Sequence, residues 1–207
     1  RQKMLKFLGA ELELTTAERG MKGALERADS LLKNTPESWS PRQFENPANV
    51  QIHMETTAEE IWRDSDGNVD VLIDGVGTGG SITGISRALK DKKPGFQTIA
   101  VEPENSPVLA GGEPGAHGIQ GIGAGFKPEI LDQSLIDKIV HIDDQQAYAM
   151  ARDVARLEGI PCGISSGATF ATALQIAQNP DYAGKSIVVM VASMAERYIS
   201  TDLFEGL

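Results

Sequence analysis

The sequence predicts an α/β fold, in which a mostly parallel sheet carries helices on both of its faces. From residue 69 onward, short apolar runs rich in β-branched residues alternate with longer segments of helical periodicity. Apolar runs of this kind are typical of strands buried on both faces, and their alternation with helices is typical of a parallel sheet. The predicted strands are residues 69–73, 98–102, 139–142 and 186–191.

The helices between these strands have sequence signals of their own. One is predicted over residues 82–89, directly after a glycine-rich loop, and another over residues 164–178. A third is predicted to begin at Asp143, which has the spacing of a capping box with Gln146. Its predicted inner face consists of five apolar residues at helical spacing: Ala147, Met150, Ala151, Val154 and Leu157.

The region before residue 69 is less regular. We expect, in order, a helix over 1–8 closed by Gly9, a strand over 11–15, a helix over 22–33, a short strand over 42–44 and a helix from Thr57 through Trp62. Thr57 and Glu60 have capping-box spacing. The first helix has no N-cap residue before it, so we expect the protein to continue upstream of residue 1. The NPAN sequence at 46–49 predicts a turn and a domain boundary, giving domains 1–46 and 47–207.

Composition excludes several classes of protein. The 207 residues carry a net charge of −10, and no basic run is longer than Lys92-Lys93, which argues against a nucleic-acid partner. The single cysteine, Cys162, excludes a disulfide scaffold, and the histidines lack the spacing of a metal site. The longest apolar stretches, such as residues 187–192, are too short to span a bilayer. We therefore expect a cytoplasmic protein with no metal and no membrane partner.

The first candidate site is the glycine-rich loop at residues 75–81 (GVGTGGS), between a predicted strand and a predicted helix. Glycines let successive backbone N–H groups turn toward one anion, and a helix N-terminus favours negative charge. We interpret the loop as a phosphate cradle, and the alternative is a tight strand-to-helix turn. It also matches G-x-G-x-x-G, and Glu102 follows at the end of the next strand, so a nicotinamide-dependent oxidoreductase stays open. A lone fingerprint is a weak signal, however, and the crowded glycines and hydroxyls also suit a compact terminal phosphate monoester, as on pyridoxal phosphate.

A second candidate is the GISSG sequence at residues 163–167, which matches the G-x-S-x-G nucleophile elbow of hydrolases. That mechanism needs a histidine later in the chain, but His53, His117 and His141 all precede Ser165. The hydrolase interpretation therefore lacks its base. Ser165 could instead begin a helix, or form a hydrogen bond with the ring nitrogen of a ligand at the sheet edge.

The third candidate is the glycine-rich loop over residues 111–126. Small residues are interleaved with three apolar ones in its second half, Ile119, Ile122 and Phe126. This pattern suits a lid or a substrate-facing loop better than the alternative, a plain surface loop.

Together these stretches resemble the O-acetylserine sulfhydrylase (cysteine synthase) family, a branch of the fold-type II pyridoxal-phosphate enzymes with a tryptophan synthase β-like fold. The matching segments are residues 5–14 (LKFLGAELEL), 20–24, 43–44, 46–49, 60–62, 75–81, 101–103, 106–108, 119–126, 158–160, 163–168 and 196–198. The resemblance implies that residues 1–46 are the tail of the smaller N-terminal domain and that residues 47–207 form the larger, cofactor-binding domain.

The resemblance also implies roles for individual residues. The cofactor phosphate would be bound by five residues of the first loop: Gly77, Thr78, Gly79, Gly80 and Ser81. Ser165 would lie at the pyridine nitrogen of pyridoxal 5′-phosphate, while Gln43, Gly121 and Ala124 would face the substrate. The implied reaction replaces the acetate of O-acetyl-L-serine by sulfide, giving L-cysteine. The family's Schiff-base lysine lies upstream of residue 1, and none of the ten lysines present matches it, so no catalytic residue is expected in this chain.

Other activities and partners follow from the same resemblance. The resemblance suggests a homodimer, and it suggests the C-terminal tail of serine acetyltransferase as a partner. The alternatives to cysteine synthase are a cystathionine β-synthase-like enzyme, the nicotinamide-dependent oxidoreductase named above, and a non-catalytic binding partner of serine acetyltransferase.

Overall fold

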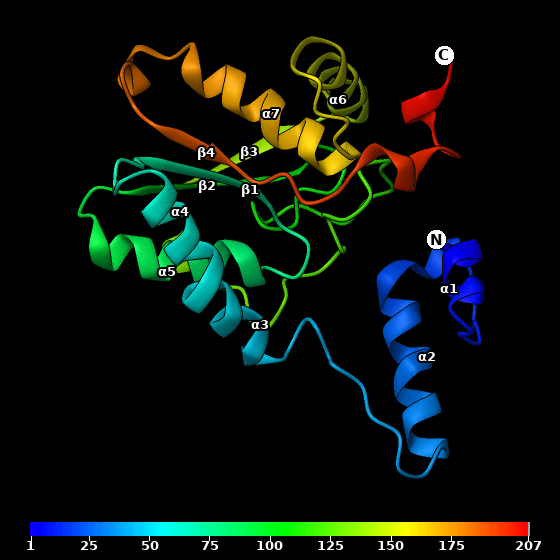
Figure 1. The fold of residues 1–207 in the computed structure, drawn as a ribbon. Helices are drawn as coiled ribbons and strands as arrows, with labels where there is room; N and C mark the ends of the chain where they lie inside the picture. Colours follow the sequence, from blue (N-terminus) through cyan, green and yellow to red (C-terminus); the bar gives the residue numbers. More distant parts are fainter. Residues whose placement is uncertain (207) are drawn as a thin grey trace. The chain divides into compact units, whose positions relative to one another are not determined.

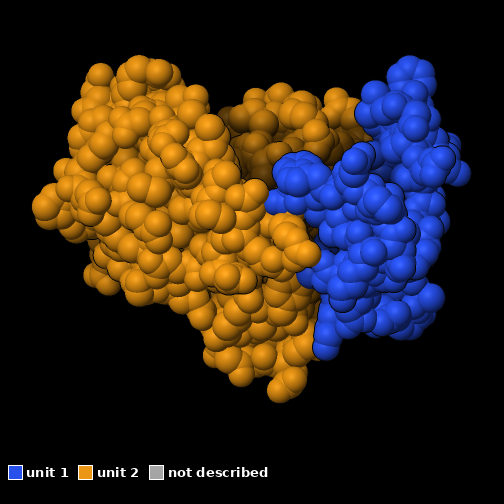
Figure 2. Space-filling view, turned by 90° about the horizontal axis from the view of Figure 1, so that it is seen from below, with its two compact units in different colours: residues 1–41 blue, residues 42–207 orange. Residues whose placement is uncertain are grey.

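The computed structural model describes residues 1–206, and the chain divides into two compact units, Arg1–Pro41 and Arg42–Leu207 (Figure 2). The division therefore lies between Pro41 and Arg42, a little before the boundary expected after residue 46. The assignment of the first part to a smaller N-terminal domain stays a prediction.

The first unit consists of short helices joined by irregular chain. Its elements are α1 (Gln2–Phe7), η1 (Ala17–Arg19) and α2 (Gly20–Asn34). Gly9 follows α1 with a φ of +84°, as a helix-terminating glycine does. The strand predicted over 11–15 is wrong, because those residues are irregular and no strand in the described part of the chain pairs with them.

The second unit begins with a helical segment where the sequence suggested a strand and turns. Residues 43–45 form a turn, so the strand predicted over 42–44 is wrong. Asn46 instead accepts a hydrogen bond from the Ala48 backbone N–H and caps α3 (Pro47–Ile52), which continues through η2 (His53–Thr57) into α4 (Ala58–Asp64). An Asn-Pro pair serves as N-cap and first helical residue as well as it serves a turn.

The predicted capping box at Thr57 also does not form. Thr57 lies inside the continuous helical segment formed by α3, η2 and α4. Its hydroxyl forms a hydrogen bond with His53 Nδ1 at 2.9 Å. A capping box satisfies the free N–H groups of a helix start, and a position inside a continuous helical segment has none to satisfy.

Four parallel strands form the sheet, in the order β3-β2-β1-β4. Their bounds are Val71–Gly75 for β1, Gln97–Pro103 for β2, Lys138–Ile142 for β3 and Ile187–Val189 for β4. β1 starts two residues later than predicted, and β4 is shorter and only half-buried. Because all four strands run the same way, their carboxyl ends meet at one edge of the sheet.

Helices cover both faces of this sheet, as the sequence predicts (Figure 1). On one face, α5 (Gly80–Lys92) packs on β1 and β2, and α3 and α4 pack against α5. On the other face lie α6 (Asp144–Glu158) and α7 (Ile164–Ala177). The part of the second unit that the structure describes also contains short 3-10 helices: η3 (Gln133–Leu135), η4 (Pro180–Tyr182), η5 (Ala195–Tyr198) and η6 (Asp202–Phe204).

The two faces have separate apolar cores. Leu72, Ile85 and Leu89 belong to the core under α5, while Ile73 and Ile164 belong to the core under α6 and α7. Each is fully buried, which stabilises the fold by about 1.5–3 kcal/mol for each side chain. Among the described helices, none has the combination of length and apolar character that a bilayer crossing requires.

The predicted start of α6 is confirmed. Asp143 accepts a hydrogen bond from the Gln146 backbone N–H at 2.8 Å, and the Gln146 side chain accepts one from the Asp143 N–H at 3.2 Å. Four of the five residues predicted for its inner face are buried or half-buried. The prediction is wrong for Leu157, which lies in the last turn of α6 and is 78% exposed.

Candidate functional site

The glycine-rich loop joins the carboxyl end of β1, the strand between β2 and β4, to the N-terminus of α5. Gly79 is the N-cap of this helix, with a φ of +80° that side-chain-bearing residues rarely adopt, and no side chain caps the helix. Within the described residues, the backbone N–H groups of Gly77, Thr78 and Gly79 donate no hydrogen bond to the protein. The helix dipole and these free donors together favour a bound anion.

Gly77 lies where the glycine-rich loop at residues 75–81 contacts the loop over residues 111–126. A Cβ atom at this position would lie 2.4 Å from the carbonyl oxygen of Gly121, so only glycine allows the two backbones to come so close. The same contact region includes Val76, whose carbonyl accepts a hydrogen bond from the Gly123 N–H at 3.0 Å. Ala124 and Gly77 line one small pocket, so the predicted substrate-facing residues lie beside the predicted phosphate loop.

Thr78 is held in place by Asn49. Its Oγ1 accepts hydrogen bonds from Asn49 Nδ2 at 3.1 Å and from the Gly80 N–H at 3.2 Å. Because the oxygen accepts in both contacts, the Thr78 hydroxyl proton is left for a ligand. Asn49 Nδ2 also donates to the Gln43 carbonyl at 3.0 Å, which ties the Gln43 backbone to the loop while its side chain is exposed.

Ser81 lies in the first turn of α5 and faces inward. Its hydroxyl donates to Asp74 Oδ2 at 2.6 Å, and Asp74 is a buried residue near the end of β1. Burial raises the pKa of the Asp74 carboxyl to about 6, against the lowering effect of hydrogen bonds from the Ser81 hydroxyl and the Gly75 N–H. Alternation along β1 points Asp74 to the α5 side of the sheet, away from the face on which Ile73 is buried.

Ser165 lies at the same carboxyl edge of the sheet, but it belongs to α7, on the face opposite α5. It lies in the first turn of α7 and is 6% exposed. Its Oγ forms no hydrogen bond with any of residues 1–206. A Cβ atom on Gly121 would lie 3.7 Å from this Oγ, so Gly121 approaches both Gly77 and Ser165. The structure therefore brings the three predicted loops together at the carboxyl edge of the sheet.

Glu102 does not occupy the place that a dinucleotide site would need. It is 2% exposed, and its carboxylate accepts hydrogen bonds from the backbone N–H groups of Leu109 and Ala110, at 2.8 and 3.1 Å. His141 Nε2 contacts the same carboxylate at 3.1 Å. Because the protein itself satisfies this buried acid, the structure does not support the nicotinamide-dependent alternative.

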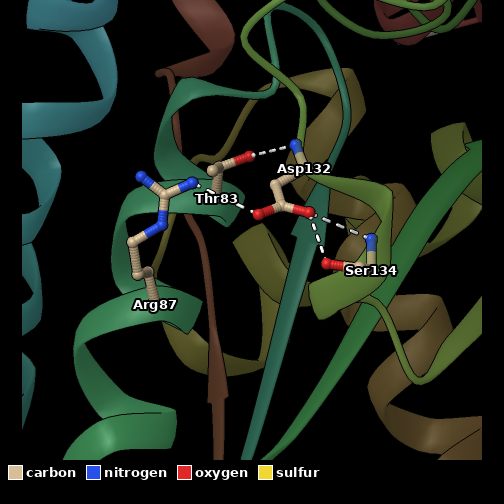
Figure 3. A network of polar contacts seen from close by, with 4 residues as sticks. All are labelled: Thr83, Arg87, Asp132 and Ser134. Carbon is tan, nitrogen blue, oxygen red and sulfur yellow. Dashed lines mark hydrogen bonds and ion pairs between the residues drawn. The ribbon is translucent and has the colours of Figure 1, made fainter.

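A polar network that no sequence pattern indicated joins α5 to residues 132–134 (Figure 3). Figure 3 shows the Asp132 carboxylate between Arg87 of α5, at 3.2 Å, and Ser134, whose hydroxyl donates at 2.6 Å. The Asp132 N–H donates to Thr83 Oγ1 at 3.1 Å. Leu131, the preceding residue, would lie 2.8 Å from a Cβ atom on Gly79, so the network fixes the segment packed against the N-cap of α5.

Asn49 and Asp74 were also missed, and only Asp74 left a signal in the sequence. It is an acidic residue between the predicted strand over residues 69–73 and the glycine loop that begins at Gly75. A carboxylate in a strand buried on both faces needs a partner, and the nearest polar groups are those of the loop. Asn49 gave no signal, because it contacts Thr78 only through the tertiary packing of α3 on α5.

The lysines of the second unit that form ion pairs lie outside these loops. Lys93 and Lys185 approach Asp70, at 2.9 and 3.9 Å, and Lys90 pairs with Asp137 at 2.6 Å. Among residues 1–206 no three His, Cys, Asp or Glu side chains are grouped as a metal site would need.

The arrangement fits pyridoxal 5′-phosphate. Three free backbone N–H groups and the Thr78 proton suit a phosphate, and the free hydroxyl of Ser165 suits a ring nitrogen at the same sheet edge. The structure offers both ends of such a ligand a polar partner.

Comparison with known proteins agrees with this geometry. Residues 1–193 match the model of a family described as pyridoxal-phosphate dependent enzyme. The chain is 53% identical to a cysteine synthase of Haemophilus influenzae over 215 residues, which cover 100% of this chain and 68% of that protein.

Solved structures give the same result. A cysteine synthase from Entamoeba histolytica superposes with a TM-score of 0.92 at 47% identity, over 99% of this chain and 60% of that one. An O-ureido-L-serine synthase superposes with a TM-score of 0.94 at 41% identity, over 100% of this chain and 65% of that one. The chain thus spans about two thirds of the length of these relatives. It belongs to the pyridoxal-phosphate dependent enzyme family, in the branch that contains the cysteine synthases.

Proposed function

We propose that this chain provides the cofactor-binding part of a cysteine synthase, which replaces the acetate of O-acetyl-L-serine by sulfide to form L-cysteine. The observation that carries the proposal is the uncapped N-terminus of α5, where the free N–H groups of Gly77, Thr78 and Gly79 lie beside Gly121 and the unpartnered hydroxyl of Ser165. The relatives with this fold and at 41–53% identity include cysteine synthases.

The first loop binds the cofactor phosphate in this proposal. The residues that hold it are Gly77, Thr78, Gly79, Gly80 and Ser81. The free backbone N–H groups of Gly77, Thr78 and Gly79 and the hydroxyls of the loop replace the water that a phosphate dianion loses, with the positive end of the α5 dipole behind them. No Lys or Arg occurs in residues 74–81, so binding depends on these dipoles rather than on a salt bridge.

Ser165 contacts the pyridine nitrogen. When bound, pyridoxal phosphate supplies an electron sink for bonds at the amino-acid substrate. A neutral hydroxyl stabilises a protonated ring nitrogen less than a carboxylate would. Ser165 therefore keeps that sink moderate, which suits elimination and replacement at the β-carbon.

Gln43, Gly121 and Ala124 face the substrate. Support comes from their attachment to the phosphate loop: Gln43 is tied through Asn49 to Thr78, while Gly121 and Ala124 lie beside Gly77. The proposal assigns no nucleophilic lysine to residues 1–206. The homodimer, the binding of a serine acetyltransferase tail and a cytoplasmic location stay predictions.

The phosphate site is tested with pyridoxine 5′-phosphate, which cannot form an imine and therefore reports on non-covalent binding alone. Calorimetric titration of the full chain should show binding of this compound, and much weaker binding of pyridoxine, which lacks the phosphate. NAD should not bind. Failure of pyridoxine 5′-phosphate to bind better than pyridoxine would overturn the proposal.

The substrate is tested with the protein at its full natural length, loaded with pyridoxal phosphate. We expect L-cysteine from O-acetyl-L-serine and sulfide. Turnover of L-serine with homocysteine instead, without cysteine from sulfide, would favour the cystathionine β-synthase-like alternative. Binding of a serine acetyltransferase tail without any turnover would favour the non-catalytic one.

A further inference from the structure

The two hydroxyls of the phosphate loop point their protons in opposite directions. Thr78 Oγ1 accepts two hydrogen bonds, so its proton is free for a ligand. Ser81 donates its single proton inward, to Asp74 Oδ2 at 2.6 Å. A serine hydroxyl has only one proton, so it cannot donate to Asp74 and to a phosphate at the same time.

Asp74 is isolated from other charges. β1 packs against β2, β4, α5 and α7, and neither β4 nor α7 contains an ionisable side chain. On β2, Glu102 is already satisfied by Leu109, Ala110 and His141. The charged residues of α5 are Arg87, Lys90, Asp91 and Lys92; its three cations pair with Asp132, Asp137 and Glu59, all away from the loop. None of them neutralises a charged Asp74.

A phosphate bound to the loop would therefore be repelled by the buried Asp74 carboxylate, with only the Ser81 hydroxyl between them. The repulsion disappears when Asp74 takes up a proton. The carboxyl can then donate to Ser81 Oγ, and the Ser81 proton turns to the phosphate. Burial has already brought the Asp74 carboxyl close to this state, since its pKa lies at about 6 before any dianion is added.

We propose that Asp74 is a positioning residue of the phosphate site: the ligand phosphate binds together with one proton from solvent, and protonated Asp74 orients the Ser81 hydroxyl toward the phosphate. One O–H bond forms, on the Asp74 carboxyl, while Ser81 keeps its own proton and no heavy-atom bond changes. This inference rests on the proposed function, because it takes the loop at residues 75–81 as the phosphate site.

The test is a calorimetric titration of the full chain with pyridoxine 5′-phosphate between pH 6 and 8.5, in pairs of buffers with different protonation enthalpies. Such pairs count the protons taken up on binding. We expect the wild type to take up nearly one proton per ligand at pH 7.5. Its affinity should fall by up to about tenfold per pH unit above pH 7, where the phosphate itself is already a dianion.

Asp74→Asn gives the opposite result. The amide introduced by this substitution is uncharged and donates to Ser81 Oγ at every pH, as protonated Asp74 would. We expect proton uptake close to zero, an affinity that is nearly constant above pH 7, and binding at pH 8.5 about 30-fold tighter than in the wild type. Asp74→Ala removes the charge without supplying the donor, so it should bind about threefold or more weakly than Asp74→Asn.

Asp132→Asn is the matched control. Asp132 is another aspartate bound to α5, but hydrogen bonds from Ser134, followed by Arg87, lower its pKa, so it is ionised throughout this pH range (Figure 3). Because Asp132 holds the segment packed against Gly79, this variant is compared with the wild type by proton uptake and by the slope of affinity against pH, not by absolute affinity. We expect both to match the wild type.

The outcomes separate this inference from the function it rests on. Binding with the same pH profile in wild type and Asp74→Asn, or wild-type binding without proton uptake, would overturn the inference alone. The wild-type proton count needs no variant, so it decides the matter even if a substitution prevents folding. No binding of pyridoxine 5′-phosphate at any pH would overturn the proposed function, and this inference with it.

Discussion

Two helices of the second unit begin in opposite ways, although both follow a strand of the same sheet. α6 opens with a reciprocal capping box, in which Asp143 and Gln146 satisfy each other's backbone N–H groups. α5 opens at Gly79, which has no side chain to act as an N-cap. Thr78 Oγ1 accepts from the Gly80 N–H, but the N–H groups of Gly77, Thr78 and Gly79 have no partner among the described residues. An N-cap side chain stabilises a helix by about 1 kcal/mol. Where it is missing, backbone N–H groups at the helix start remain free to bind a ligand.

The difference separates a structural helix start from a binding one. At α6 the negative partner of the helix dipole is a side chain of the protein, Asp143. At α5 the acid Asp74 is bound by the Ser81 hydroxyl and not by the backbone N–H groups of Gly77, Thr78 and Gly79, which stay free for an external anion. Substitutions at the two helix starts and at their neighbours distinguish these two roles.

Gly77→Ala should lower the affinity for pyridoxine 5′-phosphate at least about 100-fold, which corresponds to about 3 kcal/mol. The added Cβ would lie 2.4 Å from the Gly121 carbonyl oxygen, so one of the two loops must move. Calorimetric titration measures the loss, and circular dichroism shows whether the fold is kept.

Gly95→Ala is the control for Gly77→Ala. Gly95 follows the other end of α5 with a φ of +86°, and a Cβ atom at this position would have no neighbouring atom within 4 Å. The substitution therefore costs about 1 kcal/mol in backbone strain alone. Its ligand affinity should not change. An affinity within threefold of wild type for Gly77→Ala would contradict the close approach of the two loops.

Asp74→Asn should raise the free energy of unfolding by about 2–3 kcal/mol at pH 8, and by much less at pH 4. The pKa of Asp74 is about 6 in the folded protein against 3.8 for a free side chain. The folded state therefore holds its proton longer, and wild-type stability falls as the pH rises from about 4 to 6, then stays low. Urea denaturation at the two pH values measures the difference; an equal effect at both would contradict the shift.

Asp143→Ala should lower the free energy of unfolding by about 1 kcal/mol, because the Gln146 N–H in the first turn of α6 loses its acceptor and the capping box is broken. Affinity for pyridoxine 5′-phosphate should stay at the wild-type value. Denaturant unfolding and titration of the same sample give both numbers. A loss of binding larger than the loss of stability would show that the two helix starts are not independent.

Ser165→Ala should have the smallest effect, about a threefold loss of affinity for pyridoxine 5′-phosphate, with no change for inorganic phosphate. The Ser165 hydroxyl is proposed to contact the ring and not the phosphate. The ratio of the two affinities is the measurement, and Ser166→Ala provides a neighbouring control, since Ser166 Oγ instead accepts a hydrogen bond from the Ala192 N–H. Equal losses for both ligands would place Ser165 at the phosphate.

Local sequence patterns predicted most of the second unit. Apolar runs gave the four strands to within about two residues, and the Asp143–Gln146 pair gave the start of α6, because both signals depend on neighbours in the chain. The same reasoning failed at residues 11–15 and 42–44, where a β-like pattern exists but the described chain provides no strand beside it. A strand is stabilised by its partner, which a local pattern does not show.

The candidate site divides in a similar way. The glycine loop and Ser165 were visible as motifs, and the rule that ligands bind at the carboxyl ends of parallel strands placed them together. Asn49 and the Asp132 network were not visible, since their contacts join segments that lie 29 to 49 residues apart in the chain.

The sequence by itself determined the order of strands and helices from residue 69 onward, the glycine loop and the absence of any cation within it, because these depend only on neighbouring residues. Tertiary structure alone decided that the Glu102 carboxylate is bound by backbone N–H groups of the protein and that the Gly121 carbonyl packs against Gly77. It also decided that Asp74 is bound by Ser81 and has no counter-ion. The physical reason is that burial and hydrogen-bond partners are set by packing across the sheet, and they decide which polar groups remain free to bind a ligand.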